Sequence, residues 1–303
     1  MAVYVVGDFL RETRLRKGYT QEEVSYGICT PASLSRIENG AQKPGRLILE
    51  KLFEQLGTEN NLFNSFVSRG DMELYSAIQE LIRNITDDDV AKIEAQIEVV
   101  EKLSTNASEL EHQCLYFAKG ELERQREKND EKAMKMYMKA IRITLPDFDG
   151  KNPLRNNLLT FDEIMIINAI AILHANGDDI MTAIKLDTWL KEYMEEKVVD
   201  GKMKTAKYPM ILYNLSYWLG EESCHKEALK YAEQGVEFCI KYGNLAFFPI
   251  LLFNKGGALA EIGEVERARK YLHQSITIFE AMERPDLIQI AVEWCRIHYL
   301  IEF

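Results

Sequence analysis

The chain has 303 residues, a formal net charge of −11, 7 prolines and 17 glycines, and is rich in leucine, glutamate and lysine, which favour helices over strands. No stretch supplies the roughly 18 apolar residues of a membrane helix, and charges follow Met1 too soon for a signal peptide, so we expect a cytoplasmic protein without a membrane partner. The composition predicts an all-α protein. The five cysteines are dispersed without a CxxC pair, so we expect no disulfide framework and no metal, and no cofactor motif is present.

Charge is distributed unevenly along the chain. Residues 1–60 hold eight basic and eight acidic side chains, so the whole acidic excess lies after residue 60. A nonspecific nucleic-acid coat would be basic throughout. If this protein binds DNA, a small basic face near the N-terminus must do so.

The segment TQEEVSYGICTPASLSRIENG, residues 20–40, contains two helix starts. Thr20 and Glu23 have the spacing of a capping box, which predicts a helix over 21–27 that ends at Gly27. Thr30 is a second cap and Pro31 fits the first helical position, so a second helix is expected to run to about residue 39. Gly40 then ends it.

Two short capped helices joined by a turn form a helix-turn-helix unit. Its expected core is Val6, Leu10, Val24, Ile28, Leu34, Ile37 and Leu49. The second helix of such a unit enters the major groove, which would place Pro31, Ala32, Ser33 and Arg36 against the bases. Arg36 can donate twice to guanine, although it could instead pair with Glu22 or Glu23.

The same segment closely resembles the phage-repressor-like (Xre) helix-turn-helix, in particular that of the peptide-sensing Gram-positive regulators PlcR, Rgg and PrgX (the RRNPP family). GIC between the helices and LSRIENG, residues 34–40, at the end of the second helix carry the resemblance. It implies that Gln21 and either Asn39 or Lys43 contact phosphate and that residues 31–36 read bases. Pro31 and Ala32 depart from the glutamines of many phage repressors. The expected DNA-binding residues are Gln21, Thr30, Pro31, Ala32, Ser33, Ser35, Arg36, Asn39 and Lys43.

The acidic remainder contains a degenerate repeat. Three octets, IINAIAIL (166–173), LYNLSYWL (212–219) and LFNKGGAL (252–259), each have asparagine third and leucine eighth. A small residue follows at a matching distance, where two helices could approach closely: Ala183, Ala228 and Ala268, with Ala133 in an earlier unit. The pattern reads as tetratricopeptide-like helix pairs with long helices or loops. We expect a five-helix head over 1–68 and a right-handed superhelical solenoid over 69–303.

Local signals mark further elements of this body. Residues 72–103 predict a weaker helix pair whose second helix is capped by the acidic run 87–89, and Pro285 opens a final helix that covers the last repeat. DFDGKN, residues 147–152, lacks the spacing of a calcium loop and is predicted to be an ordinary loop before the capping box of Thr160 and Glu163.

One face of each first repeat helix groups the asparagine with apolar residues. Since the first helices of a right-handed solenoid line its concave surface, these faces predict a peptide site in which asparagine amides hold a peptide backbone. The expected peptide-binding residues are Asn168, Met210, Tyr213, Asn214, Tyr217, Ile250, Phe253 and Asn254. Alternatively, each asparagine bonds to the adjacent helix and stabilises the stack.

These features predict a homodimeric transcription regulator that binds double-stranded DNA at a palindromic or two-half-site operator, because one reading helix contacts too few base pairs. The family resemblance implies control by a short signalling peptide in the concave groove, as in quorum sensing. No P-loop, GxSxG, HExxH or dinucleotide motif is present, so no enzyme is expected. The alternatives are a repeat domain that binds a protein partner, or a repeat scaffold that does not bind DNA; DNA affinity that falls steeply with salt would exclude the scaffold.

Overall fold

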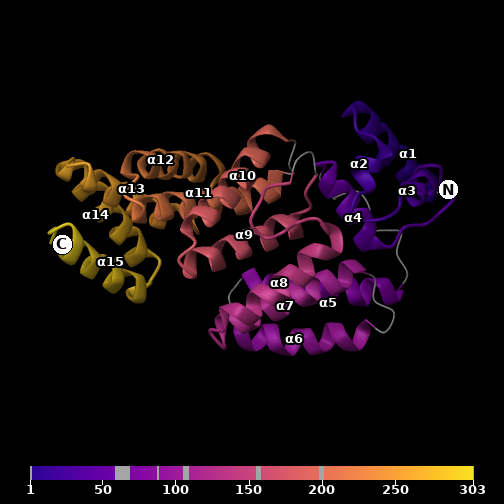
Figure 1. Ribbon diagram of the computed structural model, residues 1–303, viewed down its shortest axis with the longest axis horizontal. Coiled ribbons are helices and arrows are strands. Elements are labelled where there is room, and N and C mark those ends of the chain that lie inside the picture. The colour runs from indigo at the N-terminus through magenta and orange to yellow at the C-terminus, as the bar shows by residue number, and fades with distance from the viewer. Residues whose placement is uncertain are drawn as a thin grey trace. The chain divides into compact units, whose positions relative to one another are not determined.

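The computed structural model describes residues 2–58, 69–86, 89–104, 109–154, 158–197 and 201–302. Every regular element in these ranges is a helix, as the composition predicts (Figure 1). They pack into two compact units, one reaching from the N-terminus to Gly177 and the other formed by Asp178–Lys197 and the residues from Gly201 onward. The expected domain boundary at residue 68 borders residues 59–68, which would hold the fifth helix of the head and lie outside the described ranges.

The first unit contains nine of the described helices. They are α1 (Ala2–Arg16), α2 (Gln21–Ser25), α3 (Pro31–Glu38), α4 (Arg46–Gln55), α5 (Arg69–Thr86), α6 (Val90–Leu103), α7 (Glu109–Gln125), α8 (Asp130–Thr144) and α9 (Phe161–Asn176). Helices α1 to α4 form the head. In the rest of the unit, each helix from α5 to α8 packs against the next one along the chain, and α5 also packs against α7.

Helices α2 and α3 begin where the local chemistry predicts, whereas α2 ends at Ser25, two residues before the predicted limit at Gly27. Thr20 accepts from the backbone N–H of Glu23 while the Glu23 carboxylate accepts from that of Thr20, so the capping box of α2 is complete. Thr30 likewise caps α3 by accepting from the N–H of Ser33. Gly27 and Gly40 have φ values of 72° and 68°, a left-handed conformation that glycine adopts without a Cβ clash.

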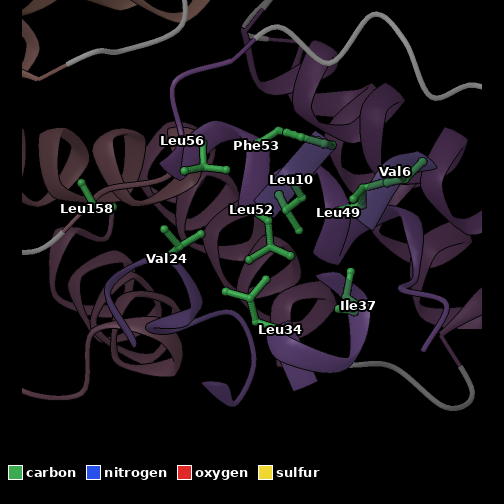
Figure 2. Packing of buried hydrophobic residues seen from close by; sticks show 10 residues of the cluster. All are labelled: Val6, Leu10, Val24, Leu34, Ile37, Leu49, Leu52, Phe53, Leu56 and Leu158. Carbon is green, nitrogen blue, oxygen red and sulfur yellow. The ribbon is translucent and has the colours of Figure 1, made fainter. Parts of the chain in front are cut away.

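The head has its own hydrophobic core, with Leu10 and Leu52 near its centre (Figure 2). Six of the seven predicted core residues are buried in it and the seventh, Ile28, packs against it half-buried. The core also takes in Leu158, from the segment that precedes α9. The head therefore shares its interior with the rest of the first unit.

Polar contacts reinforce this attachment. The Lys51 Nζ on α4 lies 2.9 Å from the Asp162 Oδ2 on α9 and 3.1 Å from the Glu54 Oε2. Gln55 donates to the carbonyl oxygens of Tyr26 and Leu158 at 3.1 and 3.2 Å. A Cβ on Gly27 would lie 2.5 Å from the Thr144 carbonyl oxygen, so the turn of the head approaches the end of α8 closely.

The second unit contains the remaining six helices. They are α10 (Ile180–Glu196), α11 (Gly201–Glu221), α12 (His225–Tyr242), α13 (Phe248–Glu261), α14 (Val265–Ala281) and α15 (Pro285–His298). Each packs against the next, and α11 also packs against α13 (Figure 1). Loops of three residues join α11 to α12, α13 to α14 and α14 to α15, and so short a loop makes consecutive helices antiparallel.

The loops within the helix pairs share a backbone conformation. Just before the second helix of four successive pairs, one loop residue has positive φ: Lys128, Asp178, Ser223 and Gly263 at 51°, 64°, 58° and 87°. Glu283 repeats the turn before α15, at 55°. Only one of the five is a glycine, so the backbone geometry repeats although the sequence does not.

The predicted small residues lie where helices meet. Ala133, Ala183, Ala228 and Ala268 are all buried. At two glycines the neighbouring helix leaves no room for a side chain. A Cβ on Gly120 would lie 2.4 Å from the Tyr137 ring, and one on Gly256 would lie 2.6 Å from the Leu272 side chain. The repeat pattern therefore reflects helix packing.

Helix α11 contains Pro209 in its interior. Proline has no N–H to donate to the carbonyl four residues earlier, which is that of Thr205. Asn244, beyond the end of α12, donates to this carbonyl oxygen at 2.9 Å and satisfies it.

Several local predictions in the body are confirmed. Asp89 caps α6, whereas residues 87 and 88 lie outside the described ranges. The capping box of Thr160 and Glu163 opens α9, and Asp149 accepts from the N–H groups of Lys151 and Asn152, as in a closed loop. The final helix begins at Pro285, and Cys295 and Ile301 pack with Leu259, Ala268 and Leu272.

No helix in the described ranges combines the length and apolarity needed to cross a bilayer.

Candidate nucleic-acid interface and ligand pocket

Helix α3 presents the predicted reading face. Its buried residues, Leu34, Ile37 and Glu38, turn into the head, while Pro31, Ala32 and Arg36 are exposed and Ser33 and Ser35 are half-buried. The Arg36 guanidinium donates to the Ser33 Oγ at 3.3 Å. Within the described part of the chain it forms no ion pair with Glu22 or Glu23, the alternative left open by the sequence.

A buried charge pair fixes the orientation of α3. The Arg14 Nε and Nη2 on α1 donate to the two Glu38 carboxylate oxygens at 2.6 and 2.9 Å, and this hydrogen bonding raises the pKa of Arg14. Gln21, at the start of α2, donates to the Glu38 Oε2 at 2.7 Å. The Glu38 carboxylate on α3 thus links α3 to both α1 and α2.

The remaining predicted DNA-binding residues surround α3. Thr30 is exposed and caps it, Asn39 is exposed and donates back to the Ser35 carbonyl oxygen, and Lys43 is exposed in the following loop. Gln21 is half-buried by its bond to Glu38. The folded head therefore brings all nine predicted residues into the neighbourhood of one helix.

The second unit contains a pocket of about 630 Å³ between the first helices of successive pairs. Residues from α11, α13 and α15 line most of it, with Phe279 of α14 and His225 and Ala228 of α12. Five of the predicted peptide-binding residues are among the lining residues: Tyr213, Tyr217, Ile250, Phe253 and Asn254. Pockets of roughly 300–1,000 Å³ with apolar walls and a few polar groups are typical of ligand sites.

Six aromatic side chains contribute to the walls of the pocket: Tyr213, Tyr217, Phe253, Phe279, Trp294 and Tyr299. The Tyr213 and Tyr217 rings are stacked with their centroids 6.4 Å apart, and burial raises the pKa of both hydroxyls. On the facing helix, Trp294 stacks on His298 at 4.0 Å and its Nε1 donates to the Tyr299 Oη at 3.4 Å. The site combines these flat aromatic faces with hydrogen-bonding groups, among them Ser216, Asn254 and the tyrosine hydroxyls.

The three predicted asparagines differ in their surroundings. The Asn214 side chain is buried and its Nδ2 donates to the Asp187 Oδ2 on α10 at 3.0 Å. The Asn254 Nδ2 donates to the Ser216 Oγ on α11 at 2.8 Å, yet Asn254 still lines the pocket. Asn168 is buried within the first unit. The bonds of Asn214 and Asn254 are those of the packing alternative, in which the amides join neighbouring helices.

Two predicted residues in the second unit, Met210 and Asn214, are not among the lining residues. Conversely, α15 supplies five lining residues that the sequence-based expectation did not include: Leu287, Ile290, Ala291, Trp294 and His298. The sequence carries a signal for them, because residues 287, 290, 291, 294 and 298 have the spacing of one helical face.

Comparison with known proteins places both parts of the chain. A helix-turn-helix family model matches residues 10–59. The uncharacterized HTH-type transcriptional regulator YqaF of Bacillus subtilis (strain 168) is 39% identical over 56 residues, which are 18% of this chain and 74% of that protein.

Over nearly the whole length, the chain is similar in structure to PlcR of Bacillus thuringiensis. The PlcR complex with the peptide PapR7 and DNA has a TM-score of 0.58 at 18% identity, with 95% of this chain and 98% of that chain covered. Apo PlcR has a TM-score of 0.60 at 17% identity, with 96% and 98% covered. At this identity the likeness establishes a shared fold, a helix-turn-helix head followed by a helical repeat body. The exposed α3, its capped ends and the match to YqaF together place the chain in the family of helix-turn-helix transcriptional regulators.

Proposed function

We propose that this protein is a cytoplasmic, homodimeric transcription regulator rather than an enzyme, and that a short peptide bound in the pocket of the second unit controls its binding to DNA. The observation that carries the proposal is the combination, in one chain, of an exposed reading face on α3 and an aromatic pocket along the first repeat helices. The PlcR structure with PapR7 and DNA, which shares the fold, supports it.

The proposed DNA site is the exposed side of α3 with the loop after it. Arg36 is assigned to a base and Lys43 to phosphate, with Gln21, Thr30, Ser33, Ser35 and Asn39 beside them. Two heads on a dimer would read two half-sites about one helical turn apart. The operator is therefore expected to be palindromic or to consist of two half-sites.

Arg36→Ala is expected to weaken binding to a duplex selected from a random pool by the wild-type protein. A bidentate contact to guanine contributes about 1–3 kcal/mol, so the loss is roughly 5- to 150-fold for each half-site, with relaxed preference at one base pair. Lys43→Ala should instead weaken binding to all sequences alike and reduce the slope of log affinity against log salt by about one. Fluorescence anisotropy at several salt concentrations measures both.

The matched control is Arg296→Ala, which removes an exposed arginine from α15 and changes the net charge equally. It should leave DNA affinity unchanged. Unaltered affinity of the Arg36→Ala protein would remove Arg36 from the interface, and salt-independent binding by the wild type would favour the scaffold alternative.

The proposed peptide site is lined by Tyr213, Tyr217, Ile250, Phe253 and Asn254. Tyr217→Ala is expected to lower capture of a random pentapeptide pool about tenfold, because aromatic side chains in pockets dominate binding energies. Equilibrium dialysis with mass spectrometry measures the captured fraction. Tyr217 is 42% exposed, so its truncation leaves the core intact.

Tyr242 on α12 provides a control of similar exposure, 49%, outside the pocket lining. Tyr242→Ala should capture peptides as well as the wild type does. Equal capture by the Tyr217→Ala protein would place the peptide elsewhere, and a wild type that captures no peptide would favour the alternative of a protein partner.

A further inference from the structure

The acidic side chains of the pocket gather at one end. Glu221 and Glu261 both line it, and each is the last residue of its helix, α11 and α13 respectively. Since α11 and α13 are the first helices of successive antiparallel pairs, they run in the same direction, and their C-terminal ends lie at the same end of the pocket. Helix C-termini carry partial negative charge, which adds to that of the carboxylates.

Positive charge is scarce at this end. The lining contains no lysine or arginine, and His225 and His298 are its basic residues. The His225 Nε2 lies 3.9 Å from the Glu261 Oε2, and within the described part of the chain Glu221 forms no ion pair with a lysine or arginine. The pocket therefore holds more negative charge than its own side chains neutralise.

Aromatic faces lie next to the carboxylates. Both Glu221 and Glu261 are close enough to Tyr299 for their charges to add to burial and raise the pKa of its hydroxyl, and Glu221 acts in the same way on Tyr217. Aromatic faces attract ammonium and guanidinium groups because the ring quadrupole is negative above the plane. Carboxylates beside aromatic rings suit a cation attached to an apolar chain.

We propose that the pocket selects peptides that carry a cationic group, which binds between Glu221 and Glu261 while neighbouring apolar side chains occupy the aromatic part. This inference rests on the proposed peptide site and specifies the chemistry of its ligand. The cation is either a free N-terminal ammonium or a lysine or arginine side chain. The charge complementarity is the same for both, and the test separates them.

The test uses the full-length protein and four pools of pentapeptides that vary only in charge. In three pools the ends are acetylated and amidated and the central residue is lysine, norleucine or glutamate; the other positions are drawn from Gly, Ser, Val, Leu, Phe and Tyr. The fourth pool has central norleucine and a free N-terminus. Equilibrium dialysis with mass spectrometry gives the fraction of each pool that the protein retains.

The wild type is expected to retain the lysine pool, the free-amine pool or both roughly 3- to 10-fold better than the capped norleucine pool, and the glutamate pool least. A preference for only one of the two cationic pools identifies the source of the cation. The Glu221→Gln/Glu261→Gln protein should retain the cationic pools about as well as the capped norleucine pool. High salt should reduce the wild type's preference for the cationic pools, because the Glu221 and Glu261 carboxylates are exposed.

The matched control is Glu222→Gln/Glu266→Gln, which removes the same charge from exposed positions on the same repeats outside the pocket lining. It should keep the wild-type preference, which excludes general attraction to the acidic body. Retention of the glutamate pool at or above the norleucine pool would overturn the inference, as would a preference that persists without Glu221 and Glu261. If the wild type retains no pool at all, the proposed peptide function itself fails, and the inference with it.

Discussion

Lys51→Met is expected to lower the free energy of unfolding of the first unit by about 3–5 kcal/mol, the usual consequence of breaking a buried ion pair by removing one partner. The Lys51 side chain is only 4% exposed and its ammonium lies within 3.1 Å of oxygens of both Glu54 and Asp162. Methionine keeps the volume and leaves these carboxylates buried without a cation. Urea unfolding followed by circular dichroism, with hydrogen exchange of α4 and α9, measures the loss.

A second variant separates charge from packing. In Lys51→Met/Asp162→Leu the ion pair is replaced by apolar side chains, a change that is often neutral or stabilising. We therefore expect it to recover much of the stability lost by Lys51→Met. A loss below about 1 kcal/mol in Lys51→Met would show that the pair contributes no more than an exposed one.

The same cluster predicts a pH dependence. Burial raises the pKa of the Glu54 carboxyl to about 7, and burial also raises the pKa of Glu50 and Glu163. A carboxyl whose pKa is higher in the folded state binds more protons there than in the unfolded chain, so its contribution favours folding at low pH and is lost as the pH rises through 7. Urea midpoints of Glu54→Gln should accordingly change less between pH 5 and 7.5 than those of the wild type.

Glu38→Ala is the second substitution with a large expected effect, because it leaves the Arg14 guanidinium buried without its carboxylate. Glu38 is 2% exposed and Arg14 7%. We expect the head to lose about 3–5 kcal/mol and, with α3 no longer held to α1 and α2, to bind DNA weakly. The tryptophans are Trp189, Trp218 and Trp294, all outside the head, so hydrogen exchange of α1 to α3 is the appropriate measurement.

Two variants check the cause. Glu22→Ala removes an exposed carboxylate from α2 and should change the stability by less than about 0.5 kcal/mol. Glu38→Gln retains one acceptor for Arg14 or Gln21 and should lie between the wild type and Glu38→Ala. Equal exchange rates in Glu38→Ala and the wild type would mean that the hydrophobic core alone fixes the head.

The sequence determined the features that depend on neighbours along the chain. A helix cap depends on a hydroxyl three residues before the N–H that it accepts from, and glycine favours a positive φ, so Thr20, Glu23, Gly27 and Thr30 could be assigned without a structure. Buried alanines such as Ala228 could be found for a similar reason, since the spacing of helix contacts repeats. The all-α class, the helix-turn-helix and the start of the last helix follow from such local rules.

Which distant groups meet depends on how the helices pack. Asn214 bonds to Asp187, Lys51 to Asp162, and α15 completes the pocket begun by α11 and α13. Ser223 and Glu283 adopt the same left-handed turn as Gly263, which their residue types alone do not favour. These choices depend on packing between helices far apart in the chain, where burial outweighs local preference, and no periodicity in the sequence specifies the partner of a buried polar group.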